Sequence, residues 1–497
     1  MNLLFAQILV ILGLFITGFV LANLILHKEN IALIAVVSYP VGVAFFGFVG
    51  MFMLIAGIEY NLLSISIAYV VLFGFTVWGR IKSSVKCNYK FGKNHMIIIL
   101  VVLIIAFISA SGIIKVGISN DSLYYYSLYP QTIVIDGGIE LSYDVFLTDV
   151  GQVVAIINTL PFLFGFNEAY GILIAMLFSF VAFFIYFVYE RMVEVLTKPR
   201  VVVGNGIKKY IAENSSFCIK FGTVISALIL VTCTPFLVMS RWVLANAYVM
   251  EYMFIIFGLV YIAQKENNSD LLWIVALFIA CLTMMRMEGG LMAGLLIICV
   301  SIYEISNERL TIFFVIPSLV FIIPYYVVLY LKLGVNPEYS FLNMKNALLQ
   351  IGFLIVIGIY IIFMRGRNWF KIIDNYFPYI VIIALGMVNI VLFAYDYNKY
   401  FENISAFFNN IVLGNGWGYF GFFVVLMLML ISKNRGFSAN SLFCISYILM
   451  CVAILFARNG ALRVGSGDSG NRVLMQIVPF VIYTLVDEIL GDFNDGE

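Results

Sequence analysis

The sequence predicts an all-α protein that crosses a membrane many times. Of its 497 residues, 63% are apolar and only 11% are charged, whereas a soluble domain carries about a quarter charged residues. The mean hydropathy is +1.05, and long apolar runs alternate with short polar segments. Because a membrane core about 30 Å thick needs roughly 20 apolar residues per helix, these observations predict a polytopic membrane protein and exclude an ordinary water-soluble enzyme.

The apolar runs predict about fifteen membrane-spanning helices. Two of them are short and meet at residues 285–290, which read Met-Arg-Met-Glu-Gly-Gly. The predicted spans lie near 3–25, 31–57, 61–79, 96–114, 168–190, 221–240, 244–263, 271–285, 289–304, 310–332, 347–364, 376–395, 413–432, 439–457 and 472–489.

The apolar stretch 150–166 is predicted to lie at the interface or to re-enter the membrane without crossing it. It contains Asn158 and Pro161. If it crossed, the basic segments 80–95 and 191–220 would fall on opposite sides, against the positive-inside rule. With this choice the basic loops lie in the cytoplasm, the N-terminus lies outside, and the first large external loop covers 115–167.

Charge and composition exclude two classes of partner. The formal net charge is +1, which leaves no basic face for a nucleic acid. The seven cysteines and two histidines show no metal-ligand or disulfide spacing. The cytoplasmic connections are too short for a nucleotide-binding domain, and no phosphate-binding Gly-rich motif occurs. Any chemistry is therefore expected on the external side or within the bilayer.

The external loop opens with an acid followed by tyrosines. Residues 119–126 read Ser-Asn-Asp-Ser-Leu-Tyr-Tyr-Tyr, so Asp121 stands close to Tyr124 and Tyr125. An acid at the water–lipid boundary can act as a general base on a hydroxyl group. Asp144 adds a further negative charge to this loop. The alternative interpretation is a helix end at the surface with an interfacial belt of tyrosines.

Two further sites keep charges in or beside apolar spans. Arg286 and Glu288 stand at the break between two short helices. They mark either a functional site or a structural ion pair that stabilises the helix break. The last external loop contains Asp468 and, at the start of the final span, Arg472. An Arg there can bind a phosphate through two N–H groups or can extend toward lipid headgroups. Glu251 lies inside a predicted span and is likewise either a functional acid or a structural one.

The order of these motifs resembles that of the GT-C glycosyltransferases, membrane enzymes that use sugars linked to lipid phosphates. The resemblance covers about 96–489 and makes residues 1–95 an N-terminal addition of three spans and a cytoplasmic loop, with 96–497 as the catalytic domain. It is carried by the external Asp motif, the interfacial helix, an outer Ser-Arg turn, the Arg-x-Glu-Gly break, an aromatic–Gly–x–x–Pro turn and a closing Gly-Asp…Arg…Pro segment. These stand at 120–125, 149–166, 239–242, 286–289, 330–337 and 467–479.

The resemblance implies an inverting glycosyltransferase. The enzyme would move a sugar from a polyprenyl-phosphate donor to a glycan, lipid or protein hydroxyl at the external face of a bacterial plasma membrane, for cell-envelope polysaccharide synthesis. Asp121 would be the catalytic base, and Arg472, with Arg286 or Lys345 as lesser candidates, would neutralise the phosphate. Glu288, Asp468, Tyr124, Tyr125 and Asp144 would support the site.

The sequence departs from the family pattern at two positions. The family often has paired acids at the first motif, whereas here Asn120 and Ser122 flank Asp121 alone. In addition, Asn246 stands where the family commonly has an acid after the outer Ser-Arg turn. No cofactor is assigned, and a role for a divalent cation stays open. Two other functions also stay open. One is a polysaccharide polymerase or ligase, although 116–167 lacks the arginines expected of it; the other is a transporter or lipid flippase, which needs polar residues at broken helices near the midplane.

Overall fold

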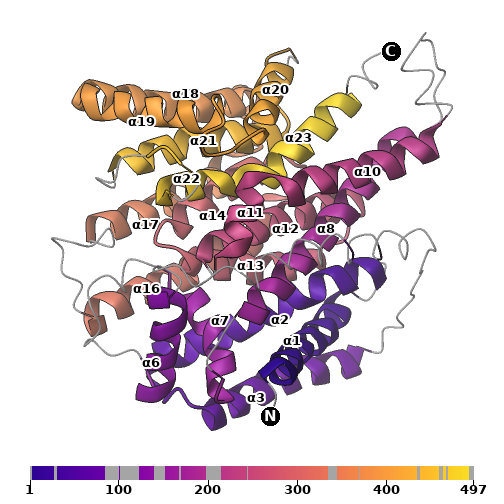
Figure 1. Ribbon diagram of the computed structural model, residues 1–497, viewed down its shortest axis with the longest axis vertical. Helices are drawn as coiled ribbons and strands as arrows, with labels where there is room; N and C mark the ends of the chain where they lie inside the picture. The colour runs from indigo at the N-terminus through magenta and orange to yellow at the C-terminus, as the bar shows by residue number, and fades with distance from the viewer. Residues whose placement is uncertain are drawn as a thin grey trace. The chain divides into compact units, whose positions relative to one another are not determined.

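The computed structural model confirms an all-helical membrane protein (Figure 1). The residues that it describes contain no strand. They are 3–26, 31–83, 100, 104, 123–138, 151–166, 170–197, 214–242, 244–333, 344–368, 370–433, 437–457, 463–465 and 468–491.

Within the described residues, eleven helices are long and apolar enough to cross a membrane. Each overlaps one of the predicted spans. Three other predicted spans correspond to shorter apolar helices, and the span predicted at 96–114 lies, apart from Leu100 and Ile104, outside the described residues. The eleven are Gln7–Ile25, Ile31–Ala56, Leu62–Gly79, Gly171–Leu196, Ser215–Thr232, Ala245–Lys265, Asn307–Val327, Met344–Met364, Lys371–Tyr395, Ala439–Phe456 and Gly470–Leu490.

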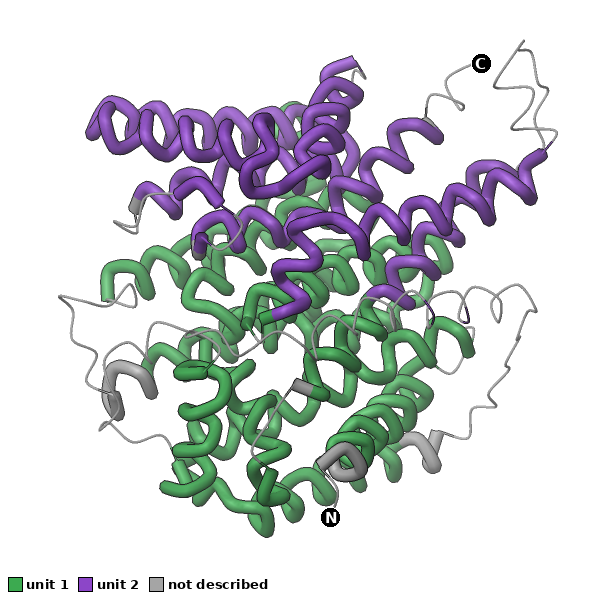
Figure 2. The backbone as a smooth tube through the Cα atoms, viewed as in Figure 1, with its two compact units in different colours: residues 1–91, 116–180, 242–374 green, residues 92–115, 181–241, 375–497 purple. Residues whose placement is uncertain are grey.

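The chain forms two compact units whose segments alternate along the sequence (Figure 2). Unit 1 comprises 1–91, 116–180 and 242–374. Its helices and π-helical turns are α1 (Leu3–Ile25), α2 (Ile31–Ala56), α3 (Leu62–Ser83), η2 (Tyr124–Leu128), α6 (Tyr129–Asp136), α7 (Gln152–Leu163), the first part of α8 (Tyr170–Leu196), α12 (Ala245–Lys265), α13 (Leu271–Met285), α14 (Gly289–Val300), α15 (Asn307–Leu310), η4 (Thr311–Val315), α16 (Ile316–Leu333), α17 (Met344–Ile359) and η5 (Tyr360–Met364).

Helices α1 and α2 lie side by side at very short range (Figure 1). A Cβ at Gly18 would overlap the carbonyl oxygen of Ser38, and one at Gly42 would overlap that of Leu14. Small residues at such a crossing let two membrane helices pack backbone to backbone. This contact fixes α1 against α2, most of which is buried.

Helix α7 supports the prediction that 150–166 does not cross the membrane. Its twelve residues rise about 18 Å, well short of the 30 Å core. Most of α7 is buried, and its Val153 and Ile157 pack against Gly47 of α2. Tyr60, in the turn between α2 and α3, hydrogen-bonds Thr159 of α7 at 2.6 Å. The helix is therefore anchored to the N-terminal helices.

Unit 2 comprises 92–115, 181–241 and 375–497. Its described helices are the second part of α8, α10 (Ser215–Thr232), α11 (Thr234–Arg241), most of α18 (Lys371–Tyr395), α19 (Tyr397–Ile411), α20 (Phe420–Lys433), α21 (Ala439–Ala457), α22 (Ser469–Leu474), the 3₁₀ turn η6 (Met475–Ile477) and α23 (Val478–Gly491).

Two details of unit 2 differ from the sequence prediction. The span expected at 221–240 ends at Thr232, because Cys233 is extended and a separate helix, α11, begins at Thr234. Pro235 lies in the first turn of α11, where its missing N–H is tolerated, whereas in the interior of one continuous helix it would remove a hydrogen bond and clash with the preceding turn. Residues 397–411, between the predicted spans 376–395 and 413–432, form helix α19 rather than a plain connection. Its N-terminus is capped by the Asp396 carboxylate, which accepts a hydrogen bond from Lys399 N at 3.1 Å.

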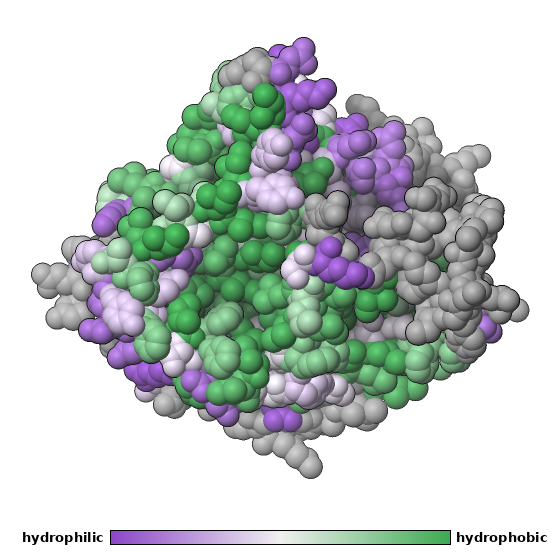
Figure 3. Space-filling model, turned by 90° about the horizontal axis from the view of Figure 1, so that it is seen from above, coloured by the Kyte–Doolittle hydropathy of each residue, from purple (hydrophilic) through white to green (hydrophobic). Residues whose placement is uncertain are grey.

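The apolar surface agrees with a membrane location. Only 6% of the spanning residues of α3, and likewise of α18, are buried within the protein. Apolar side chains also cover much of the face shown in Figure 3. A soluble monomer rarely exposes apolar patches larger than a few hundred Å², so these faces require a lipid environment.

Candidate functional site

The helix break between α13 and α14 lies at the centre of a buried polar cluster in unit 1. Arg286 ends α13 with extended backbone, and Gly289 begins α14. Arg286 Nε donates to Glu288 Oε1 at 2.8 Å, and the side chains are 13% and 0% exposed respectively. Arg286 Nη1 donates to Asn246 Oδ1 of α12 at 2.6 Å. A nearly buried cation is thus fixed between one carboxylate and one amide.

Two further helices stabilise the backbone of this break. The Met287 carbonyl accepts hydrogen bonds from Tyr326 Oη of α16 at 3.1 Å and from Gln350 Nε2 of α17 at 2.6 Å. Gln350 Oε1 accepts from the Gly290 N–H at 3.1 Å. A broken membrane helix is tolerated only where neighbouring groups satisfy its freed backbone. The break is therefore rigidly supported by α12, α16 and α17.

The interfacial helix α7 begins against this break. A Cβ at Gly151, directly before α7, would overlap the backbone of Met285 and Arg286, so the close approach requires glycine. Further along α7, the buried Asn158 donates to the Tyr126 carbonyl at 3.2 Å. Tyr126 belongs to η2, the π-helical turn that begins three residues after Asp121 in the sequence. Helix α7 therefore connects the break with the start of the segment that is predicted to be external.

Glu251 is a second buried acid, on the same helix as Asn246. It is 0% exposed, and neither carboxylate oxygen has a hydrogen-bond partner among the described residues. The same holds for the hydroxyl of Tyr248, one turn earlier. The other nearby tyrosines, Tyr39 and Tyr252, donate to the carbonyls of Ile172 and Pro40. Glu251 thus lies buried among tyrosines.

Asp468 and Arg472 belong to unit 2, where both lie at the short helix α22. The Asp468 carboxylate caps this helix by accepting from Asn471 N at 3.0 Å, so its visible role is structural. Arg472 is 5% exposed. Its neighbour Asn471 accepts from Trp417 Nε1 at 2.6 Å and donates to the Gly465 carbonyl. The closing Gly-Asp…Arg segment is therefore an ordered turn at its described positions.

The structure brings together only some of the predicted site residues. Arg286 and Glu288 form an ion pair, and Asp468 and Arg472 share one helical turn. Lys345 is exposed at the start of α17. Tyr124 is exposed, Tyr125 is half-buried, and their neighbour Tyr126 is the buried member of the run. Asp121 and Asp144 lie outside the described residues.

Sequence reasoning missed two polar residues that complete the cluster, namely Gln350 and Tyr326. Gln350 carried a signal, because an amide inside an apolar run must find a partner. Tyr326 carried none, since tyrosine is common in these helices. Among the described residues, no group of three or more His, Cys, Asp and Glu side chains could bind a metal ion.

Comparisons with protein-family models, curated proteins and solved structures found no match to the chain.

Proposed function

We propose that the protein is a membrane glycosyltransferase that moves a sugar from a polyprenyl-phosphate donor to a hydroxyl group at the external face. The observation that supports this most is Arg286, a nearly buried cation fixed by Glu288 and Asn246 in a largely apolar chain. A preorganised cation in a water-poor site stabilises a departing phosphate far better than a solvated one.

The donor class follows from cell chemistry. Nucleotide sugars are made in the cytoplasm, so an external enzyme needs a sugar that is carried across the membrane on a lipid. The apolar helices give such a lipid access, and the sequence contains no nucleotide-binding motif. The acceptor can be a glycan, a lipid or a protein, because each offers a hydroxyl.

In the proposed reaction, Asp121 takes the proton of the acceptor hydroxyl. The acceptor oxygen forms a bond to the anomeric carbon while the bond from that carbon to the phosphate oxygen breaks. The electron pair remains on the polyprenyl phosphate, which leaves. Arg472, with Arg286 or Lys345, neutralises its charge. Attack from the face opposite the phosphate inverts the anomeric centre.

The test is turnover by the purified protein in phospholipid vesicles. A panel of polyprenyl-phosphate monosaccharides is supplied with short glycans as acceptors, and release of polyprenyl phosphate is measured. Asp121→Asn should lower turnover by about 10²–10⁴-fold, the usual contribution of a general base. Asp136→Asn is the matched control, because Asp136 is an exposed acid of the same external segment, and should retain turnover. Wild-type turnover in Asp121→Asn would exclude this mechanism.

A transporter or flippase is the second candidate, and Glu251 is the observation that favours it. A fully buried acid without a hydrogen-bond partner among the described residues, on a helix beside a broken helix pair, is typical of ion-coupled carriers. In sealed vesicles, a transporter would move labelled polyprenyl-phosphate sugar between leaflets, and Glu251→Gln would abolish this movement. Absence of movement by the wild-type protein would reject the candidate.

A further inference from the structure

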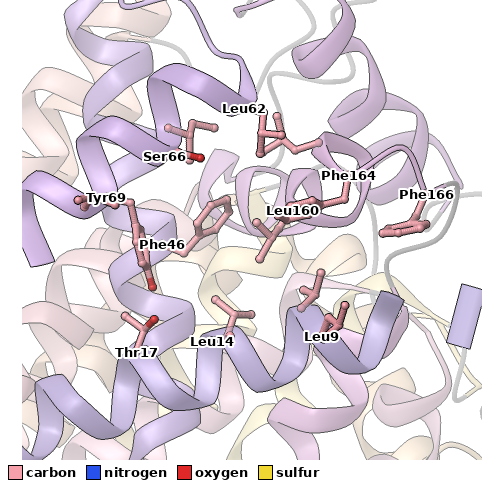
Figure 4. A pocket seen from close by; sticks show the side chains of 15 residues that line it. Leu9, Leu14, Thr17, Phe46, Leu62, Ser66, Tyr69, Leu160, Phe164 and Phe166 are labelled. Atoms are coloured by element: carbon pink, nitrogen blue, oxygen red, sulfur yellow. The ribbon is translucent and has the colours of Figure 1, made fainter. Parts of the chain in front are cut away.

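Unit 1 contains an apolar cavity of about 320 Å³ between its N-terminal helices and α7. Leu9 and Leu14 of α1 face it from one side, and Leu62 and Ser66 of α3 from the other (Figure 4). Phe46 of α2 and Leu160 and Phe164 from α7 and the turn after it close it.

The lining gives water almost nothing to bind. Its side-chain polar atoms belong to Thr17, Ser66 and Tyr69, and the hydroxyls of Thr17 and Tyr69 hydrogen-bond each other. An apolar cavity of about 150 Å³ is known to stay dry and to bind benzene. A cavity of twice that volume with so few polar partners therefore takes a hydrocarbon.

The cavity opens toward the membrane. Leu9, Leu62 and Val70 line it and are themselves exposed. The helices that carry them, α1 and α3, are among the eleven that can span a membrane. The medium at the opening is accordingly lipid hydrocarbon, which is the most abundant possible occupant.

We propose that this cavity binds one acyl chain of a membrane phospholipid. Mass action favours phospholipid as the occupant, because it is in large excess around the opening and any rarer lipid must compete with it. The acyl chain's methylenes are already out of water in the bilayer, so the gain on binding is the van der Waals contact that they make with the cavity lining. The acyl chain would fill the space between α1, α3 and α7 as a structural lipid.

This inference goes beyond the proposed function, because the cavity and the polar cluster are different places in unit 1. Leu160 and Leu163, near the end of α7, line the cavity, whereas Gly151, before its start, contacts the α13–α14 break. The intervening helix rises about 15 Å. A bound chain would stabilise α7, and thereby the cluster, without entering it.

The experiment uses the full chain in vesicles that contain phosphatidylethanolamine with a photoreactive diazirine in one acyl chain. After illumination, labelled residues are located by mass spectrometry of peptides. Labels are expected on cavity residues such as Leu14, Phe46 and Leu160 as well as on outward residues such as Ile67 and Phe75.

Gly13→Phe should block the cavity, since Gly13 lines it and a Cβ there meets no atom within 4 Å. Cavity labelling should fall about tenfold, because a filled apolar space does not accept further methylenes. Gly74→Phe is the matched control: Gly74 is an exposed glycine of α3 with the same open space, but it does not line the cavity. Ser66→Phe is a second blocking variant, and outward labelling reports that each variant has folded.

Two results would overturn the proposal. One is labelling confined to outward residues, or cavity labelling that Gly13→Phe and Ser66→Phe leave unchanged. The other is displacement of the phospholipid label by a few polyprenyl phosphate molecules per protein, which would identify an isoprenoid chain as the occupant. Neither result depends on turnover, so failure of this proposal and failure of the proposed function are distinguishable.

Discussion

Arg286 is an ion-pair partner and a proposed phosphate ligand, and single substitutions cannot separate the two roles. Its guanidinium neutralises Glu288, which is 0% exposed, and it is also a candidate ligand for the departing phosphate. Removing one partner of a buried ion pair leaves an uncompensated charge and costs about 3–5 kcal/mol, whereas removing both can cost little. The two roles therefore predict different behaviour of single and double variants.

Arg286→Gln should lower the free energy of unfolding by about 3–5 kcal/mol. The double variant Arg286→Gln, Glu288→Gln should recover most of that loss and still turn over poorly, because the cation is absent. Denaturant unfolding in detergent, followed by the fluorescence of the five tryptophans, measures the first effect and polyprenyl phosphate release the second. A double variant with wild-type turnover would reduce Arg286 to a structural residue.

Tyr60 gives a residue-scale prediction about pH. Burial raises the pKa of its hydroxyl above the ordinary value, which is about 10. Above pH 10 the unfolded chain therefore loses this proton while the folded protein keeps it, so the contribution of Tyr60 to stability is present below that pH and declines as the pH rises. The free energy of unfolding between pH 8 and 11 should fall less steeply in Tyr60→Phe. Equal slopes would contradict the assignment.

At the scale of elements, sequence predicted helix positions better than helix contacts. The Arg-Met-Glu-Gly-Gly run indicated the α13–α14 break, because two charges and two glycines interrupt an apolar run. Its supports from α16 and α17 are more than 30 residues away in the chain, and no local pattern specifies such a contact. Helix α19 was missed because it is amphipathic and too polar on average to be predicted as a span from hydropathy. Its Phe401 and Phe408 are exposed while Asn403 and Asn410 are buried, the reverse of a soluble helix.

The contact between α7 and the break predicts a strict requirement for glycine. In Gly151→Ala the new Cβ would overlap the backbone of Met285 and Arg286, and such overpacking costs roughly 1–3 kcal/mol. The variant should unfold more easily and should also lose turnover, because the start of α7 is displaced. Gly138→Ala is the control, since a Cβ at Gly138 meets no atom within 4 Å. Equal stability of the two variants would show that the approach is not tight.

At the scale of the whole molecule, composition alone predicted the class. A chain with only 11% charged residues must lie in lipid over most of its length. The eleven long apolar helices among the described residues agree with this. Composition could not predict which charges meet. The structure pairs Arg286 with Glu288 in unit 1 and buries Arg472 in unit 2. The binding of a donor phosphate by Arg472 or Arg286, with Asp121 at the sugar, stays a prediction.

The most direct test of the glycosyltransferase proposal is a cryo-electron microscopy structure of the protein in lipid nanodiscs with a polyprenyl-phosphate monosaccharide bound. We expect the phosphate oxygens within hydrogen-bond distance of the Arg472 or Arg286 guanidinium, and the Asp121 carboxylate on the face of the sugar opposite the phosphate. A phosphate bound away from both arginines, or an Asp121 on a surface that the sugar does not reach, would contradict the proposal.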